Sequence, residues 1–323
     1  MSTNGLDHGP ARLAIVGNGV VGRRVTKRLA ERSSDVVHLD TRRLDLASSY
    51  RLDRVDVAVL AHPGPHHRNA RTLLERGIHV VSVGDRVDDV EHLVQLASLA
   101  DAADRSLVIG AGMSPGVTGL LARHLASAFA SVDEIHVAVH GTAGPACARQ
   151  HHRALAGDAL TLLDGQFVAS RAGTGRELAW FPEPVGAYDC YRAELPSVSL
   201  LHRTFPEAAR ITARMSANRR DRLTSRLPML TPPHREGGVG AVRVEVRGAR
   251  ADGSRHSSIA GIAEMVGTAS AANGCAHVEM IRAGASGSGL VVPGDARLDT
   301  LELLHLVERF GVRLQTFTGI PSA

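Results

Sequence analysis

Three glycines near the amino end of the chain are spaced as G-x-G-x-x-G within the run 17–22, GNGVVG. In that spacing the first glycine permits a tight turn, the second lets a diphosphate approach the backbone, and the third lets a helix pack closely on a strand. Amides at the start of the helix, and the positive end of its dipole, attract the phosphates. We therefore expect the whole run to bind a dinucleotide: Gly17, Asn18, Gly19, Val20, Val21 and Gly22.

An acidic residue, Asp40, follows 18 residues after the last of these glycines. A carboxylate at this place accepts hydrogen bonds from the adenosine ribose, and it repels the 2′-phosphate that distinguishes NADP from NAD. The next residues, Thr41, Arg42 and Arg43, carry side chains that bind such a phosphate. The expected cofactor is therefore NAD or NADP, with Asp40, Thr41 and Arg42 among its binding residues.

A histidine-rich loop, AHPGPHH, begins at the end of the apolar run Val55–Ala61. If that run is a strand, the loop lies at its carboxyl end, where an open α/β sheet binds its ligand. We expect Ala61, His62 and Pro63 to contact the cofactor. His66 is a candidate catalytic residue beside the nicotinamide, and the alternative for both histidines is a surface or helix-capping position.

Two further titratable residues, Tyr188 and Asp189, lie in the segment YDCY that follows a proline-rich turn. Hydride transfer needs a proton donor near the reacting nitrogen or oxygen, and an Asp or Tyr in a dry cleft can serve. We therefore take both as candidate catalytic residues, with packing against a sheet as the alternative for Tyr188. Lys27 is the only lysine of the chain and falls in a predicted helix, so no Schiff-base lysine is expected.

Cysteine and histidine gather at residues 147–152, shortly after His140. Cys147 and His151 are four residues apart, so on a helix both would face the same side, as zinc ligands do. Two ligands from one helical turn do not complete a site, and the spacing fixes no geometry for His140 or His152. We therefore expect no metal site.

The elements that must position these residues alternate along the first third of the chain. Short apolar runs predict strands, and apolar residues at helical spacing predict the helices between them. This alternation predicts an α/β fold, a Rossmann domain with a doubly wound parallel sheet over residues 1–115. The expected strands are Leu13–Val16, Val36–Leu39, Val55–Ala61, Ile78–Val83 and Ser106–Ile109, and the expected helices include His66–Arg76 and Val87–Ala103.

The rhythm changes after Gly116, and residues 116–290 predict a second, α+β domain for substrate binding and dimerisation. Its expected helices are Val117–Ala128 and Ile259–Ala272, and its expected strands are Glu134–His140, Val242–Arg247 and Ala276–Ile281. The small residues of 264–274 would allow close packing against another backbone or the cofactor. Residues 291–323, with a helix over Leu298–Phe310, are expected to pack back on the Rossmann domain.

Four motifs together resemble the saccharopine dehydrogenase family: the glycine run 17–22, Val81–Asp85, Gly110–Gly116 and Phe181–Gly186. The resemblance covers the first domain well and the second in outline. It implies hydride transfer between a nicotinamide and a carbon–nitrogen double bond of an amino-acid-like small molecule that lies between the domains. Pro115 pre-sets the start of a helix and leaves amides facing the cleft, so Ser114 and Pro115 are expected beside the cofactor.

The chain departs from this pattern at Asp40, where NADP-binding members of the family carry an arginine. A sugar or polyol dehydrogenase of similar plan is the second reading, but Gly84–Arg86 replaces the Glu-Lys-Pro signature of that group. A third reading is a sensor protein that binds dinucleotide without turnover. The fold class alone suggests a homodimer.

Composition limits the remaining function classes. The formal net charge is +4, and all but one of the lysine and arginine residues are arginine. Six arginines fall within 210–226, where they could bind a carboxylate, contact nucleic acid or form a solvated face. Aromatic residues make up only 3% of the chain, so the stacking platforms of single-strand binders are missing and no nucleic acid is expected. Three scattered cysteines, no signal-like segment and no long apolar run indicate a cytoplasmic protein without membrane contact.

Overall fold

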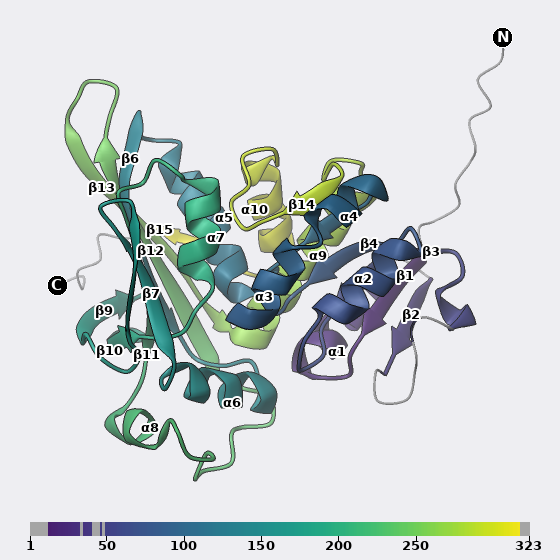
Figure 1. Cartoon of the computed structure of the whole chain (residues 1–323), viewed down its shortest axis with the longest axis horizontal. Coiled ribbons are helices and arrows are strands. Elements are labelled where there is room, and N and C mark those ends of the chain that lie inside the picture. Colours follow the sequence, from purple (N-terminus) through teal and green to yellow (C-terminus); the bar gives the residue numbers. More distant parts are fainter. Residues whose placement is uncertain (1–11, 33–34, 41–45, 47–48, 317–323) are drawn as a thin grey trace.

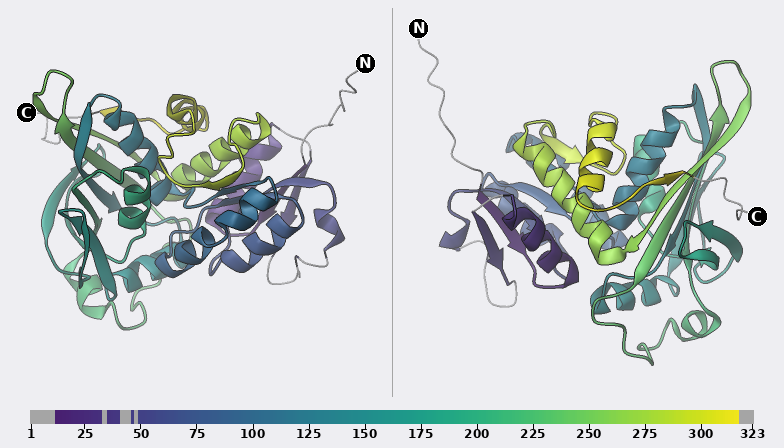
Figure 2. Two further views of the ribbon diagram at one scale, coloured as in Figure 1. Left: turned by 45° about the horizontal axis from the view of Figure 1, so that its top comes forward. Right: turned by 180° about the vertical axis from the view of Figure 1, so that it is seen from behind.

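The computed structural model describes residues 12–32, 35–40, 46 and 49–316. It contains two sheets, one in each half of the molecule, with helices packed between them (Figure 1). The helix α9 (Val266–Arg282) lies between the two sheets and contacts strands of both (Figure 2). The space between the two halves is therefore framed by elements of each.

The first sheet has six parallel strands in the order β14-β5-β4-β3-β1-β2. Its strands are mainly apolar because helices cover both faces, which is the pattern of a doubly wound sheet. The predicted Rossmann fold is confirmed. The strands are β1 (Arg12–Val16), β2 (Val36–Leu39), β3 (Val55–Leu60), β4 (His79–Ser82), β5 (Ser106–Val108) and β14 (Gly289–Val291).

Four helices accompany the first five strands, and one of the predicted helices is wrong in extent. The segment Val87–Ala103 forms two helices, because the amide of Leu96 bonds to the carbonyl of Leu93 and this tighter turn ends the first of them. The helices are α1 (Val20–Ala30), α2 (His67–Glu75), α3 (Val87–Val94) and α4 (Ala97–Ala102), with a short 3₁₀ turn η1 (Tyr50–Leu52) before β3.

The second sheet is mixed and has the order β15-β13-β12-β6-β11-β10-β9, with β7 and β8 attached beside β11. Only β6 and β11 run parallel to each other. Its strands are β6 (Ser131–His140), β7 (Asp158–Leu163), β8 (Gln166–Arg171), β9 (Glu177–Phe181), β10 (Gly186–Arg192), β11 (Arg210–Ser216), β12 (Val239–Ala249), β13 (Arg255–Met265) and β15 (Gln315–Thr316). The helices are α5 (Thr118–Ala126), α6 (Pro145–Ala154), α7 (Ser197–Thr204), α8 (Arg219–Thr224) and α10 (Thr300–Arg309).

Two predicted elements of the second half are wrong. The segment expected as a helix, Ile259–Ala272, is strand β13 as far as Met265, where it pairs with β12. The segment expected as a strand, Ala276–Ile281, is the end of α9. Nearly every residue of α9 is buried, so the helix has no side that must be polar. Without a polar side, apolar residues do not recur at helical spacing, and the sequence does not reveal the helix.

Small residues let α9 approach the first domain closely. A Cβ atom on Gly267 would lie 2.7 Å from a methyl carbon of Val20 on α1. The short π-helical turn η2 (Met113–Val117) is held against α9 by two hydrogen bonds, from the Met113 amide to Ser270 Oγ at 3.1 Å and from Asn273 Nδ2 to the Gly112 carbonyl at 3.0 Å. The small-residue run therefore serves close packing between helices and backbone.

The carboxyl-terminal part of the described chain touches both halves. Strand β14 extends the first sheet beside β5, α10 packs on α9 and α5, and β15 pairs with β13 of the second sheet. The domain limits at residues 115 and 290 stay predictions. None of the helices within the described ranges has the length and apolar character that crossing a membrane requires.

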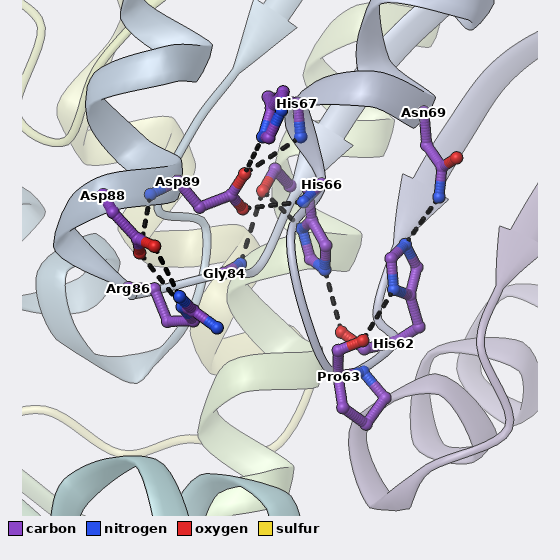
Figure 3. Close-up of polar contacts among 10 residues, drawn as sticks. His62, Pro63, His66, His67, Asn69, Gly84, Arg86, Asp88 and Asp89 are labelled. Atoms are coloured by element: carbon purple, nitrogen blue, oxygen red, sulfur yellow. Dashed lines mark hydrogen bonds and ion pairs between the residues drawn. The ribbon is translucent and has the colours of Figure 1, made fainter. Parts of the chain in front are cut away.

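The loop between β3 and α2 is fixed by a buried histidine, His66 (Figure 3). Its Nε2 lies 2.8 Å from the carbonyl oxygen of His62, which only accepts, so this nitrogen carries the proton. Its Nδ1 lies 2.8 Å from Ser82 Oγ at the end of β4 and accepts from that hydroxyl. A neutral ring thus joins the loop to the neighbouring strand.

The same loop is held from α3 by the buried carboxylate of Asp89. Its two oxygens accept from the amides of His66 at 2.7 Å and His67 at 3.0 Å, which are at the start of α2 (Figure 3). These amides have no partner within the helix, and a carboxylate near a helix start stabilises it. Asp89 therefore caps α2 from another helix and ties the end of the β3–α2 loop to α3.

The buried ring of His66 makes stability depend on pH. Burial, together with the charge of the neighbouring His62, lowers the pKa of His66 to about 4, against 6.5 for the ordinary side chain. The unfolded chain therefore takes up the proton first as the pH falls. Stability from the neutral ring is fully present above pH 6.5 and is lost as the pH drops through 4.

We expect a His66→Asn variant to lose less stability than the wild type on going from pH 7 to pH 4, by about 2–3 kcal/mol. Urea unfolding at several pH values measures this difference. His305→Asn changes an exposed histidine of α10 and is the matched control. Its free energy of unfolding should change with pH as the wild-type value does. A His66→Asn curve parallel to the wild-type curve would contradict the assignment.

Candidate functional site

A cavity of about 610 Å³ lies at the carboxyl ends of β1, β3 and β4. Its volume falls in the usual range for small-molecule sites, about 300–1,000 Å³. One wall consists of the glycine turn, the β3–α2 loop and the segment after β4, and the opposite wall is α6 with Glu194. Gly112, Met113 and Ser114 of the short turn lie between the two walls.

The glycine turn between β1 and α1 has the geometry that its sequence predicts. Gly17 has a φ of +124°, and a Cβ there would lie 2.6 Å from the His62 amide nitrogen. A Cβ on Gly22 would lie 2.1 Å from the Gly17 carbonyl oxygen. Gly19 is different, since a Cβ there would come no closer than 3.9 Å to the Ala61 carbonyl oxygen. The fold thus requires the first and third glycines, and the middle one leaves room on the cavity side.

The first turn of α1 opens into the cavity. Gly19, Val20 and Val21 line it, and the turn contains no acidic side chain that would repel an anion. Of the other expected residues in the motif, Gly17 and Gly22 shape the turn from behind, and Asn18 is exposed, with its carbonyl accepting from Arg23.

Some of the remaining residues expected at the cofactor line the cavity, and others do not or lie outside the described residues. Asp40 directly follows β2, whereas Thr41 and Arg42 lie outside the described residues. Ala61, His62, Pro63 and Ser114 line the cavity. Pro115 is buried next to Ser114 and is not among the residues that line the cavity.

The two histidines of the β3–α2 loop are both neutral. Burial lowers the pKa of His62, whose Nδ1 donates to the Pro63 carbonyl at 3.0 Å and whose Nε2 accepts from Asn69 Nδ2 at 2.9 Å (Figure 3). Both ring nitrogens of His66 are engaged within the domain. His66 lines the cavity, but with both ring nitrogens engaged its geometry favours a role in ordering the loop over the expected catalytic role beside the nicotinamide.

Tyr188 and Asp189, the other expected catalytic residues, are on β10 and do not line the cavity. The Tyr188 ring is 44% exposed and packs at 4.1 Å, between centroids, on the ring of His140. Asp189 forms an ion pair with Arg176 at 2.9 Å. The structure thus does not bring these two side chains together with the glycine turn, and the packing alternative describes Tyr188.

Asp85, Cys147 and His151 form a side-chain cluster at the wall opposite the glycine turn. The sequence predicts a role for none of the three. Helix α6 begins after Gly144, and a Cβ there would lie 2.7 Å from a methyl carbon of Val20, so α6 starts directly against α1. One turn further, Cys147 Sγ lies 3.7 Å from His151 Nε2, and the same nitrogen lies 3.2 Å from Asp85 Oδ2. Burial alone would lower the pKa of His151, but its interactions with Cys147 and Asp85 raise the pKa well above 6.5.

Sequence reasoning assigned no role to Asp85, although a signal was present. Asp85 follows the end of β4 just as His62 follows the end of β3, and neighbouring parallel strands end at the same edge of a sheet. Its partner residues Gln150 and His151 come from a helix of the second half, 65 and 66 residues further along the chain. That distance is why no local pattern joins them.

Charged side chains of both signs surround the cavity. Arg86 binds Asp88 through two hydrogen bonds, one of them 3.0 Å long between Nε and Oδ1. Burial, together with nearby Asp88 and Asp158, raises the pKa of Glu194 on the opposite wall. Arg149 and Arg153 of α6 line the solvent side of the same cavity. A ligand with both a carboxylate and an amino group would find partners for each.

Comparison of the whole structure with known proteins identifies its fold. No protein-family model matches the sequence. No curated protein sequence matches it either. The structure is similar to apo saccharopine dehydrogenase (L-Glu forming) from Saccharomyces cerevisiae, with a TM-score of 0.67, 13% identity, and coverage of 96% of this chain and 100% of that chain. It is also similar to an amine dehydrogenase from Mycobacterium smegmatis, with a TM-score of 0.51, 15% identity, and coverage of 88% and 97%.

The expected resemblance to saccharopine dehydrogenase is thereby confirmed for the fold. Both similarities span nearly the entire length of each chain, so they include the parallel sheet, the mixed sheet and the helices between them. The chain has the two-domain α/β fold of these dehydrogenases.

Proposed function

We propose that this protein is an NAD(P)-dependent oxidoreductase that acts on a C=N or C=O bond of an amino-acid-like small molecule. One observation carries the proposal: the amino end of α1, bared by Gly19, opens into a cavity that α6 closes from the other side. Dinucleotides bind at this place in doubly wound sheets, at the carboxyl ends of the strands. The fold shared with saccharopine and amine dehydrogenases supports it.

The residues of the turn fit a dinucleotide. The amides of the first turn of α1 would hold the diphosphate, with Gly19 leaving space for it. Asp40 would accept from the adenosine ribose. Ala61, His62, Pro63 and Ser114 would line the nicotinamide half. When bound, the nicotinamide supplies or accepts the hydride.

The opposite wall supports an amino-acid-like substrate. Arg149 and Arg153 would attract a substrate carboxylate, and Glu194 an amino group. A cofactor and a substrate bound between α1 and α6 would displace water from this space, which would strengthen these charge interactions. Expected catalytic roles for Tyr188 and Asp189 are not part of this proposal, because both lie outside the cavity.

The two alternative functions find less support. A sensor without turnover would be expected to fill its cleft, whereas the cavity beside the glycine turn is open and partly polar. A sugar or polyol dehydrogenase of the expected plan needs a general-base lysine, and Lys27, the only lysine, is an exposed residue of α1 outside the cavity. A homodimer in the cytoplasm belongs to the proposal as well, and gel filtration tests the oligomeric state.

Substitution of the middle glycine tests cofactor binding. A Gly19→Asp variant should fold, because the position has ordinary backbone angles and room for a side chain, but its carboxylate would repel the diphosphate. We expect wild-type protein to shift NADH or NADPH fluorescence and the variant to lose at least about 100-fold in affinity. Gly238→Asp is the matched control, since Gly238 also faces open space and lies outside the cavity. Wild-type protein that binds neither nucleotide would end the proposal.

Substitution of the acidic residue after β2 tests the choice of cofactor. Loss of the Asp40 carboxylate removes both its bond to the ribose and its repulsion of a 2′-phosphate. We expect the preference for NADH over NADPH to fall by about tenfold in Asp40→Ser, measured as the ratio of the two dissociation constants. Glu75→Ser, at an exposed acidic residue of α2 outside the cavity, should leave the ratio unchanged. An equal ratio in Asp40→Ser and wild type would remove Asp40 from the cofactor site.

A substrate screen tests the reaction itself. Pairs of amines and keto acids are supplied with NADH or NADPH, and the loss of nicotinamide absorbance is followed. We expect turnover with at least one such pair and none with sugars or polyols in the oxidising direction. Nucleotide binding without turnover of any pair would favour the sensor, and turnover of polyols alone would favour the second reading.

A further inference from the structure

Three side chains from two distant segments meet at one point of the cavity. Asp85 follows β4 of the first sheet, whereas Cys147 and His151 are one turn apart on α6. A carboxylate oxygen, a sulfur and a ring nitrogen from these residues all lie within 4.8 Å of one another. We propose that Asp85, Cys147 and His151 bind a divalent cation of the zinc type, with the fourth coordination position open to the cavity.

The distances fit tetrahedral coordination. Zinc binds cysteine sulfur at about 2.3 Å and histidine nitrogen or carboxylate oxygen at about 2.0–2.2 Å, so neighbouring ligand atoms of a tetrahedral site are about 3.3–3.6 Å apart. Here the sulfur and the nitrogen are 3.7 Å apart, and the nitrogen and the oxygen are 3.2 Å apart. These two distances match a tetrahedral site to within tenths of an ångström, and the third pair, the sulfur and the carboxylate oxygen, lies within 4.8 Å.

Hydrogen bonding alone accounts poorly for the arrangement. A single atom, His151 Nε2, faces both the Cys147 sulfur and the Asp85 carboxylate. One ring nitrogen carries either one proton or one lone pair, so it makes one directed hydrogen bond. Either the Cys147 sulfur or the Asp85 carboxylate is then left without a well-directed bond to this nitrogen. A cation between the three atoms contacts all of them, and it balances the two negative charges of a thiolate and a carboxylate.

The cluster is oriented by its surroundings as metal ligands usually are. Gln150 Nε2 donates to the outer oxygen of Asp85, Oδ1, at 2.5 Å, which turns Oδ2 toward His151. The helix fixes Cys147 and His151 relative to each other. Outer contacts of this kind set the direction of the ligands and raise metal affinity.

The donor set selects the class of ion. Sulfur and imidazole favour zinc and cobalt over magnesium or calcium, which prefer oxygen throughout. Three protein ligands with an open fourth position are typical of catalytic zinc sites, and all three residues line the cavity that the glycine turn also lines. A substrate oxygen or nitrogen in the fourth position would be polarised there.

The other members of the histidine–cysteine segment do not belong to the site. His140 Nδ1 is bonded to Ser216 Oγ at 2.8 Å, and His152 Nε2 to Thr224 Oγ1 at 3.2 Å. The expectation of no metal arose because the sequence offered these two as the remaining ligands. Within the part of the chain that the structure describes, this is the only group of three such side chains with the required spacing.

Cobalt titration of the full-length, chelator-treated protein under reducing conditions tests the site, because a thiolate bound to Co²⁺ gives a charge-transfer band in the near ultraviolet. We expect this band to saturate at one Co²⁺ per chain and to disappear when Zn²⁺ is added. Cys147→Ser should lack the band, whereas Cys190→Ser and Cys275→Ser should keep it, since those two cysteines are fully buried elsewhere. Asp85→Asn and His151→Gln should weaken Co²⁺ binding by about 10–100-fold.

The proposal does not rest on the proposed oxidoreductase function, because the titration needs no nucleotide. NADH binding is measured on the same samples, so metal binding without nucleotide binding would end the functional proposal alone. A wild-type protein without the band, or a Cys147→Ser variant that keeps it, would overturn the metal site. Circular dichroism of each variant shows that a lost band does not come from unfolding.

Discussion

The close approach of three backbone segments around the first turn of α1 is the constraint on which the rest of the structure depends. The turn after β1, the start of α6 and the start of α9 each meet this turn at a glycine: Gly22 within α1 itself, Gly144 before α6 and Gly267 in α9. A Cβ at any of the three would lie within 2.7 Å of a neighbouring atom. At Gly22 the neighbouring atom is the backbone carbonyl oxygen of Gly17, so no larger residue fits without movement of the backbone. At Gly144 and Gly267 the neighbouring atoms belong to the side chains of Val20 and Arg24, which would have to move instead.

This contact sets the position of both cavity walls. Because α9 packs along α1 and the start of α6 touches Val20 of α1, the second half of the chain is held against the first at the carboxyl ends of the strands. The amides at the start of α1 then face the space that remains open. Ser270 Oγ accepts a hydrogen bond from the Met113 amide, and Asn273 Nδ2 donates one to the Gly112 carbonyl. These two bonds hold the Gly112–Ser114 turn at the edge of that space, so the site is bounded by backbone on several sides.

Two buried histidines show how surroundings decide chemical character. His66 accepts from a hydroxyl and donates to a carbonyl, and burial keeps its ring neutral. His151 is also shielded from water, yet a thiol and a carboxylate face its ring, and the pKa moves in the opposite direction. The first histidine orders a loop, and the second belongs to a cluster that can hold a proton or a cation.

The amino-acid sequence by itself determined the parallel sheet and the glycine turn. Strands such as β1 and β3 are mostly apolar, with Asp56 as the one charged residue inside β3, and the motif at 17–22 acts within a few residues of chain, so local pattern suffices. Only the tertiary structure decided that Ala276–Ile281 is helical, because a helix buried on all sides has no polar face to reveal its period. It also decided that Asp85, and neither Tyr188 nor Asp189, lies in the cavity. Which loops meet across a cleft depends on how two domains pack, and no short stretch of sequence contains that information.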